Sequence, residues 1–271
     1  MSPTTRAVIL ARGLGTRMRQ GDAGAALDAA QAAVADAGMK GMMPIGRPFL
    51  DYVISALADA GLTDACLVIG PEHQAVRDYY GALETHRVRI HFAVQREPRG
   101  TADAVAAARD FAGDATFLVL NSDNYYPVEA YRLLATLGAS GLVGFDRAGL
   151  VADGNIPEDR IRKFALVECD AAGFMTSIVE KPDEAAYARM AAHALVSMNL
   201  WSFSPVMFEA CARVRPSVRG ELEVQDAVRI AMRELGERFA VIPFSGGVLD
   251  LSSRRDVAAV ARHLAGTVVR L

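Results

Sequence analysis

A glycine-rich turn near the N-terminus holds the residues with the clearest chemical potential. The apolar run at residues 8–11 leads directly into the turn at residues 12–17, which reads RGLGTR. Glycine lets backbone N–H groups approach phosphate oxygens without a Cβ in the way, and Arg17 adds a fixed positive fork for the same anion. Ligands of open α/β sheets bind at the carboxyl ends of the strands. The turn therefore predicts a phosphate site, which would be a nucleoside triphosphate site if the rest of the chain agrees.

Further short motifs follow this turn, and each brings charged or amide side chains to the end of an apolar run or to the start of a helix-like segment. In chain order they are KGMMP from Lys40, QREPRGTADA from Gln95, NSDN from Asn121, EKP from Glu180, and VLD ending at Asp250. A glycine turn alone is a weak indication, because many α/β proteins use one to close a turn. An ordered set of such motifs is much more specific.

With these motifs in this order, the chain resembles the sugar nucleotidyltransferases, also called nucleotide-sugar pyrophosphorylases, over essentially its whole length. It is most similar to the glucose-1-phosphate thymidylyl- and uridylyltransferases. The matching patterns are G-x-G-T-R, K-x-x-x-P, G-T-A-x-A, D-N and E-K-P. The resemblance implies transfer of a nucleotidyl group from a nucleoside triphosphate (NTP) to a sugar 1-phosphate, with release of pyrophosphate. Both reactants are anionic, so such catalysis is mainly positioning and charge neutralisation.

The resemblance also implies roles for individual residues of the nucleotide site. Arg17 and Lys40 would be the catalytic cations on the triphosphate. Asp123 and Asp250 would hold Mg²⁺, which prefers a few carboxylates and keeps several waters. Gln95 matches the position where pyrimidine-using relatives bind the base, which favours UTP or dTTP. The residues expected to contact the nucleotide are Leu10, Ala11, Gly13, Gly15, Thr16, Gln95, Gly100 and Thr101.

For the second substrate, the resemblance implies that Glu180 accepts from sugar hydroxyls, that Lys181 donates to the sugar phosphate, and that Asn199 adds a contact. Glucose 1-phosphate is the default sugar. Structural alternatives stay open for these positions. Asp123 and Asp250 could cap helices, Glu180 and Lys181 could be an exposed strand-end pair, and Asn199 could serve packing.

Four features depart from the family pattern. Arg12 stands where relatives carry a small residue, Ser122 where many have glycine, and Gly41 where proline is usual. The fourth is an insert at residues 23–37 with nine alanines, which lengthens the separation between Arg17 and Lys40. Alanine favours helix, but a short helix with so thin an apolar stripe would hold loosely. The insert is either a surface elaboration or a mobile lid over the nucleotide.

The elements that must position these residues alternate between strand and helix in the first half. Strands are expected at 6–11, 65–70, 87–95 and 116–121, and helices at 49–60, 73–83, 101–111 and 128–137. This rhythm predicts an α/β fold with a doubly wound, mostly parallel, Rossmann-like mixed sheet flanked by helices.

The second half changes character. Runs at 163–170 and 174–181, joined by DAAG, predict a β-hairpin in the substrate half. Further strands are expected at 194–203, 239–244 and 247–251, with helices at 205–214, 224–235 and 254–264. No repeat or low-complexity linker separates the halves. We therefore expect one nucleotidyltransferase domain over 1–271, with a nucleotide-binding half at about 1–125 and a sugar-phosphate-binding half at about 126–271.

Composition limits the class of protein and its partners. The apolar fraction is 52%, charged residues make up 23%, and the formal net charge is −3. A dedicated nucleic-acid or anionic-membrane binder would usually be basic, so neither partner is expected. The three cysteines form no CxxC pair and predict small buried side chains. With no signal-peptide pattern and no apolar run of about 20 residues, we expect a cytoplasmic protein. A homo-oligomer is possible.

Two other functions remain open from sequence. A guanylyl-, adenylyl- or cytidylyltransferase would share the G-T-A-x-A motif and could act on another sugar phosphate or on phosphocholine. A non-catalytic nucleotide-binding regulator would have the same fold. The chain keeps Lys40, Asp123 and Asp250, which favours the enzyme.

Overall fold

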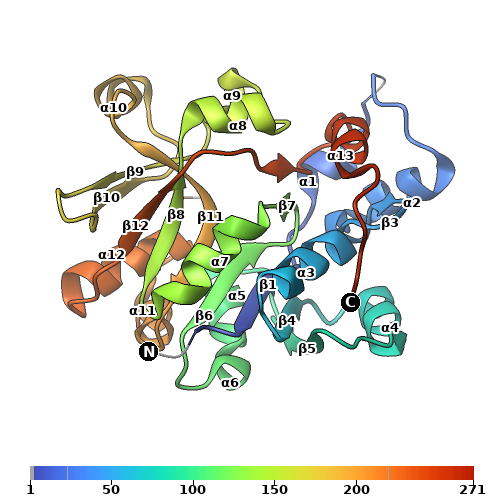
Figure 1. The fold of residues 1–271 in the computed structure, drawn as a ribbon, viewed down its shortest axis with the longest axis horizontal. Helices are drawn as coiled ribbons and strands as arrows, with labels where there is room; N and C mark the ends of the chain where they lie inside the picture. Colours follow the sequence, from blue (N-terminus) through green and yellow to red (C-terminus); the bar gives the residue numbers. More distant parts are fainter. Residues whose placement is uncertain (1–2, 23, 219) are drawn as a thin grey trace.

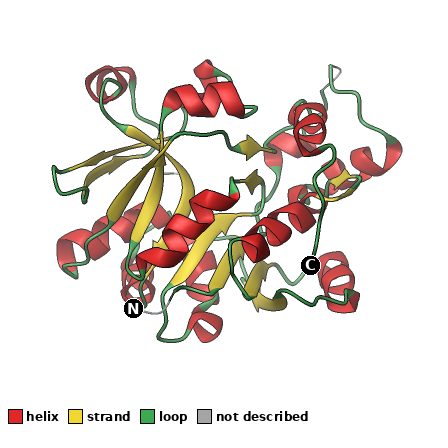
Figure 2. Cartoon of the chain, viewed as in Figure 1, coloured by secondary structure: helices red, strands yellow, loops and turns green. Residues whose placement is uncertain are grey.

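A computed structural model describes residues 3–22, 24–218 and 220–271. Within these residues a nine-stranded mixed sheet runs through the molecule, and helices cover both of its faces (Figures 1 and 2). The main strand order is β10-β9-β11-β6-β1-β4-β5, and β8 joins β11 to β12. The predicted α/β class, with a parallel core flanked by helices, is confirmed.

The parallel core explains why the glycine turn and the NSDN motif meet. It consists of β1 (Arg6–Leu10), β4 (Asp64–Ile69), β5 (Arg89–Val94) and β6 (Phe117–Asn121). Strand β1 lies between β4 and β6, and these strands are almost wholly buried and apolar, as expected where both faces are covered. Leu10 is paired with Asn121. The segments that follow the two strands therefore leave the sheet at the same edge.

Two apolar cores lie on opposite faces of the sheet. One is built largely on α5 (Thr101–Ala107), α11 (Val206–Arg213) and α12 (Val224–Glu234), which pack against one another. The other contains α3 (Phe49–Asp59), α7 (Val128–Leu137) and α13 (Asp256–Leu264). Helix α4 (Gln74–Ala82) contacts β5, and the short helix α6 (Arg109–Ala112) follows α5.

The antiparallel part of the sheet belongs to the second half of the chain. It contains β8 (Gly141–Phe145), the hairpin β9 (Ala165–Cys169) and β10 (Met175–Val179), and β11 (Leu195–Phe203), while β12 (Ala240–Phe244) adds a parallel pairing to β8. The start of β11 pairs with β9, whereas its end pairs with β6. Between these two segments, the register of β11 against β8 shifts, and Asn199 has a φ of 58°. Strand β11 therefore changes its partner from β9 to β6 around Asn199.

A short ribbon connects the two halves at the carboxyl edge of the sheet. Strand β13 (Leu249–Asp250) pairs antiparallel with β7 (Asn124–Tyr125), which sets Asp250 opposite Asn124. The predicted runs at 239–244 and 247–251 therefore belong to different sheets, because β12 pairs with β8 instead. A second small ribbon joins β2 (Pro44–Ile45) and β3 (Arg47–Pro48).

Several elements were not predicted from sequence. These include β8 and the helices α8 (Arg147–Asp153), α9 (Glu158–Ile161) and α10 (Glu184–Met190). Strand β8 reads GLVGF, and glycine is depleted in strands. A Cβ on Gly141 would lie 2.6 Å from the Ala240 carbonyl oxygen, so close backbone packing explains that glycine. Cysteine burial was predicted correctly for Cys66 and Cys211 but wrongly for Cys169, which is exposed on the hairpin.

The alanine-rich insert forms a capped helix, α2 (Ala29–Ala37), between α1 (Thr16–Arg19) and the 3₁₀ turn η1 (Lys40–Met42). Asp28 and Gln31 form a capping box at its start. Gln31 also donates to the Pro44 carbonyl at 3.1 Å, and Arg254 pairs with Asp36. Ala23 lies outside the described residues. These tethers hold the helix more firmly than its composition predicted.

Among the described residues, no helix combines the length and apolar character that crossing a membrane requires.

Candidate active site

The glycine turn presents unpaired backbone donors to a cavity. In the described chain, the N–H groups of Gly13, Leu14 and Gly15 make no hydrogen bond. Gly15 has a φ of 61°, and a Cβ there would lie 2.3 Å from the carbonyl oxygen of Gly38, at the end of α2. The turn is therefore packed backbone against backbone. Unpaired N–H groups that line a polar cavity form an anion site.

Two adjoining cavities, of about 270 and 600 Å³, follow the carboxyl edge of the sheet. Their walls have Leu10, Gly13, Lys40, Thr101 and Asp123 in common. Among the predicted site residues, the smaller cavity adds Ala11, Gln95 and Gly100, and the larger adds Gly15, Thr16, Arg17, Glu180, Lys181, Asn199 and Asp250. The fold thus brings every predicted site residue to one cleft.

Gln95 lies at the end of the cleft formed by the smaller cavity, and its amide is already oriented. Its side chain is buried, and Nε2 donates to the Gly100 carbonyl and to Asp103 Oδ2, each at 2.9 Å. Because both partners can only accept, the Gln95 Oε1 atom remains available as an acceptor. Gly100 has a φ of 120°, and a Cβ there would lie 2.5 Å from the Leu222 carbonyl. Asp103 was not singled out from sequence.

The two predicted catalytic cations differ in their surroundings. Lys40 Nζ lies 2.8 Å from Asp123 Oδ2, and both side chains are largely buried. Arg17 is exposed and forms no ion pair with any described residue. Arg17 is therefore open to an incoming anion, whereas Lys40 is held at the carboxylate.

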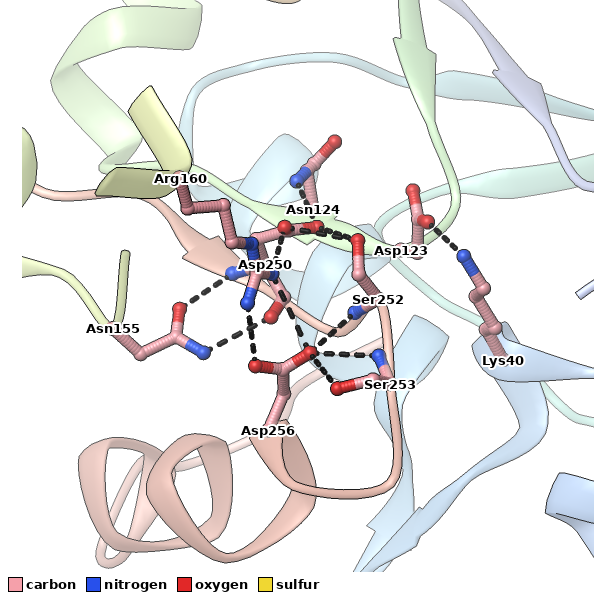
Figure 3. Close-up of polar contacts among 9 residues, drawn as sticks. All are labelled: Lys40, Asp123, Asn124, Asn155, Arg160, Asp250, Ser252, Ser253 and Asp256. Carbon is pink, nitrogen blue, oxygen red and sulfur yellow. Dashed lines mark hydrogen bonds and ion pairs between the residues drawn. The ribbon is translucent and has the colours of Figure 1, made fainter. Parts of the chain in front are cut away.

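Asp250 lies in a dense polar cluster beside this pair (Figure 3). Its carboxylate is buried, accepts from Asn124 Nδ2 at 3.2 Å and from Ser252 Oγ at 2.8 Å, and is ion-paired with Arg160. Burial, together with the negative charge of Asp123, raises the pKa of Asp250. Arg160 was missed because α9 has no motif.

Asp123 and Asp250 fit a magnesium ion by the chemistry of their donors. They come from elements joined by the β7–β13 ribbon, and their charges repel each other across the cleft. No group of three or more carboxylate, histidine or cysteine side chains placed to hold a metal occurs in residues 3–22, 24–218 and 220–271. Two carboxylates completed by phosphate oxygens and water are the ligand set that Mg²⁺ prefers.

The predicted sugar residues lie together at the other end of the cleft. Lys181 and Asn199 are the non-glycine residues with positive φ in the described chain, at 44° and 58°. The buried Gln225, at the start of α12, donates to Glu180 Oε2 at 3.3 Å and to Asn199 Oδ1 at 3.0 Å. Tyr126 donates to the Met198 carbonyl at 2.6 Å and holds the adjoining strand. Gln225 was also missed, because only the tertiary fold brings it to the hairpin.

Arg12, which departs from the family pattern, turns toward the loop after β4. Its Nε and Nη2 atoms lie 3.2 and 3.3 Å from the carboxylate oxygens of Glu72, and its side chain is buried. The Glu72 hydrogen bonds and charge therefore balance an arginine at a position where small residues are usual. This pairing lowers the pKa of Glu72.

Comparison with known proteins agrees with this geometry. Residues 32–248 match the nucleotidyl transferase family. The UTP–glucose-1-phosphate uridylyltransferase AglF of Haloferax volcanii is 27% identical over 252 residues, covering 93% of each chain. The nucleotidyltransferase Agl11 of the same organism and the glucose-1-phosphate thymidylyltransferase of Streptomyces griseus are each 28% identical, but this chain spans only 57% and 56% of their lengths.

The fold is shared with solved structures. A UDP-glucose pyrophosphorylase complexed with UDP-glucose superimposes with a TM-score of 0.72 over 97% of this chain and 98% of that one, at 17% identity. Sequence and fold agree. The chain therefore belongs to the nucleotidyl transferase family, among the sugar-1-phosphate nucleotidyltransferases that make nucleotide sugars.

Proposed function

We propose that this protein joins UTP or dTTP to glucose 1-phosphate and releases pyrophosphate. The family match supports nucleotidyl transfer to a sugar phosphate. The orientation of Gln95 is the observation that supports the choice of base. Glucose is proposed because relatives named as uridylyl- and thymidylyltransferases act on glucose 1-phosphate.

The base preference follows from hydrogen-bond complementarity. With its amide hydrogens directed to Gly100 and Asp103, Gln95 presents only its Oε1 acceptor. The N3–H of uracil or thymine can donate to that atom. In the same pose, cytosine N3 and adenine N1 carry no proton and would set an acceptor against an acceptor, so the base would have to shift before its exocyclic amino group could donate to Oε1. Guanine carries an N1–H, so GTP is the discriminating competitor.

The chemical step needs phosphates to be held and their charge balanced. In our proposal the free N–H groups of the glycine turn and the exposed Arg17 hold the triphosphate, while Lys40 stands at the α-phosphate. A phosphate oxygen of the sugar 1-phosphate attacks the α-phosphorus, a new P–O bond forms, and pyrophosphate leaves with the bonding electrons. Mg²⁺ held by Asp123 and Asp250 would supply further charge neutralisation when bound.

The sugar end offers both hydrogen-bond donors and hydrogen-bond acceptors. Asn199 Oδ1 is taken by Gln225, so the Asn199 amide hydrogens are left to donate to hydroxyls. Gln225 uses its own amide hydrogens on Glu180 and Asn199, so its Oε1 atom can accept. Lys181 lines the same cavity and makes no ion pair with the described residues, so it can receive the sugar phosphate.

The test is pyrophosphate release from UTP, dTTP, CTP, GTP and ATP, with glucose 1-phosphate and Mg²⁺. We expect kcat/KM for UTP or dTTP to exceed that for CTP and ATP by about 10²-fold or more. Equal or faster turnover of CTP, ATP or GTP would refute the base assignment. A parallel panel of other sugar 1-phosphates and phosphocholine tests the acceptor. Stabilisation by a triphosphate without turnover of any pair would instead indicate a regulator.

A further inference from the structure

Three side chains of the protein hold the carboxylate of Asp250. Asn124 and Ser252 donate to Oδ1, while Ser252 and Arg160 contact Oδ2. The side chain is almost fully buried, and its main chain is also fixed, because Asn155 Oδ1 accepts from the Asp250 N–H at 2.7 Å. A cation that binds Oδ2 from the cleft therefore competes with Arg160 for that oxygen.

Arg160 is the group best placed to move. Its guanidinium is shared between Asp250 and Asp256, with Nη1 2.7 Å from Asp256 Oδ1 (Figure 3). Its Nε atom is buried and has no hydrogen-bond partner. Arg160 therefore has a second counter-ion if it leaves the first, and its hydrogen bonding is incomplete as it stands. It also lines the larger cavity, beside Asp123 and Lys40.

Asp256 is anchored independently of Arg160. Its Oδ2 atom accepts from the N–H groups of Ser252 and Ser253 at 3.0 and 2.7 Å, and from Ser253 Oγ at 3.0 Å. These bonds close the turn that leads from β13 into α13. Asp256 can therefore keep its position whether the guanidinium is shared or belongs to it alone.

The charges near the cleft favour an exchange. Asp123, Asp250 and Asp256 carry one more negative charge than Lys40 and Arg160 balance. Asp123 and Asp250 line the same cavity as two carboxylates, and like charges at one site repel each other. A divalent ion between these two carboxylates would relieve that repulsion, and the guanidinium would then be the surplus cation.

We propose that Arg160 is an internal counter-ion of Asp250, which competes with the divalent cation and transfers to Asp256 when that cation binds. This inference rests on the proposed function, because it takes Asp250 as a metal carboxylate. Arg160 is then a positioning residue: it keeps Asp250 in place and charge-balanced in the empty cleft, and it makes the carboxylate harder for a free cation to capture.

The test measures Mn²⁺ binding to metal-free protein, without nucleotide, by the electron paramagnetic resonance signal of free Mn²⁺. Arg160→Gln removes the competitor, so we expect Mn²⁺ to bind about tenfold more tightly than to the wild type. Arg162→Gln is the matched control, because Arg162 lies over the Tyr187 ring at 5.0 Å and does not contact Asp250. The Mn²⁺ affinity of the Arg162→Gln variant should equal that of the wild type. Unchanged or weaker binding by Arg160→Gln overturns the proposal.

A second variant moves the affinity the other way. Asp256→Asn keeps an oxygen for the Ser252 and Ser253 N–H groups but removes the alternative counter-ion, so Arg160 stays on Asp250 and Mn²⁺ should bind several-fold more weakly. Equal or tighter binding contradicts the exchange, even if Arg160→Gln fails to fold. Adding Asp250→Asn to Arg160→Gln should abolish the gain in Mn²⁺ affinity. If the double variant kept that gain, the ion would bind at a site other than Asp250. Pyrophosphate release is scored separately, so failure of the proposed function is distinguishable from failure of this inference.

Discussion

The two ends of the cleft differ in how far they depend on main-chain groups and on side chains. The proposed nucleotide end relies largely on main chain, with Gln95 as the side chain that faces the base: it has the free N–H groups of Gly13 and Gly15, and the glycine backbone at position 100 packs on Leu222. The sugar end relies on side chains, with Gln225 joining Glu180 to Asn199. Main-chain recognition depends on backbone conformation, whereas side-chain recognition changes with each substitution.

The contrast explains what each end tolerates. At the nucleotide end, Arg12 replaces a small residue, yet its side chain turns away to Glu72 and leaves the turn intact. Leu14, also in the turn, is exposed. At the sugar end, the positive φ of Asn199 and the hydrogen bond from Gln225 together fix the position of the Asn199 side chain. We therefore expect substrate choice to vary through the sugar end.

The largest expected effect comes from the point where both ends meet. Lys40→Ala removes the cation beside Asp123 at the attacked phosphate, so kcat should fall about 10²- to 10³-fold in a pyrophosphate-release assay. Arg132→Ala removes an exposed cation on α7 and serves as the control, with activity unchanged. A Lys40→Ala enzyme that keeps more than a tenth of wild-type kcat would contradict the assignment.

A pair of glycine variants tests the main-chain end. Gly15→Ala forces a side chain into a φ of 61° and against Gly38, so the free energy of unfolding should fall by about 2 kcal/mol or more. Gly13→Ala has nothing within 4 Å of the new Cβ, and its stability should stay within about 0.5 kcal/mol of the wild type. Urea denaturation measures both. Equal losses would show that backbone packing at Gly15 does not hold the turn.

The main-chain end was the more predictable part of the site. Its motif residues lie within short sequence windows, such as Gly13 to Arg17 and Gln95 to Thr101, where a strand end and a helix start signal the turn locally. The alternation of strands and helices in the first half also predicted the class of fold. Both signals are local, and local patterns are what sequence periodicity reports.

The residues that were missed depend on long-range register. Arg160 contacts Asp250 on β13, which pairs with β7, and Gln225 contacts Asn199, where β11 shifts register against β8. Glu72, the partner of Arg12, follows a different strand. Strand β8 was not predicted because its two glycines resemble turn residues. They are required instead by close packing against neighbouring residues. No local pattern encodes such pairings.

The side-chain end should respond to Gln225→Ala with a change confined to one substrate. Loss of the bridge removes the Gln225 hydrogen bonds that orient Glu180 and Asn199, so KM for the sugar phosphate should rise about tenfold, while KM for the triphosphate stays unchanged. Gln74→Ala, an exposed glutamine paired with Asp78 on α4, is the matched control. If KM for the triphosphate rose equally, the two ends would be one coupled unit and the contrast between them would fail.

The smallest expected effect is the dependence of stability on acid pH at one carboxylate in each half, Asp64 on β4 and Glu168 on β9. In the nucleotide half, hydrogen bonds from Arg89 hold the pKa of Asp64 well below its usual range. In the sugar half, hydrogen bonds from Ser177 and then His193 lower the pKa of Glu168. A depressed carboxyl pKa stabilises the fold above the unfolded value, near 4, and this contribution is lost as pH falls toward the folded value.

The penalties of Asp64→Asn and Glu168→Gln should therefore be full at pH 7 and smaller at pH 3. Each should stay below about 1 kcal/mol, because water screens both ion pairs. The penalty at Asp64 should be the larger, since its guanidinium partner donates two hydrogen bonds of 2.8 Å, whereas Glu168 is paired with a hydroxyl and an exposed imidazole. Thermal unfolding of each variant beside the wild type at the two pH values measures this. A penalty that is the same at pH 3 and pH 7 would mean that lost packing, and not the charged carboxylate, causes the destabilisation.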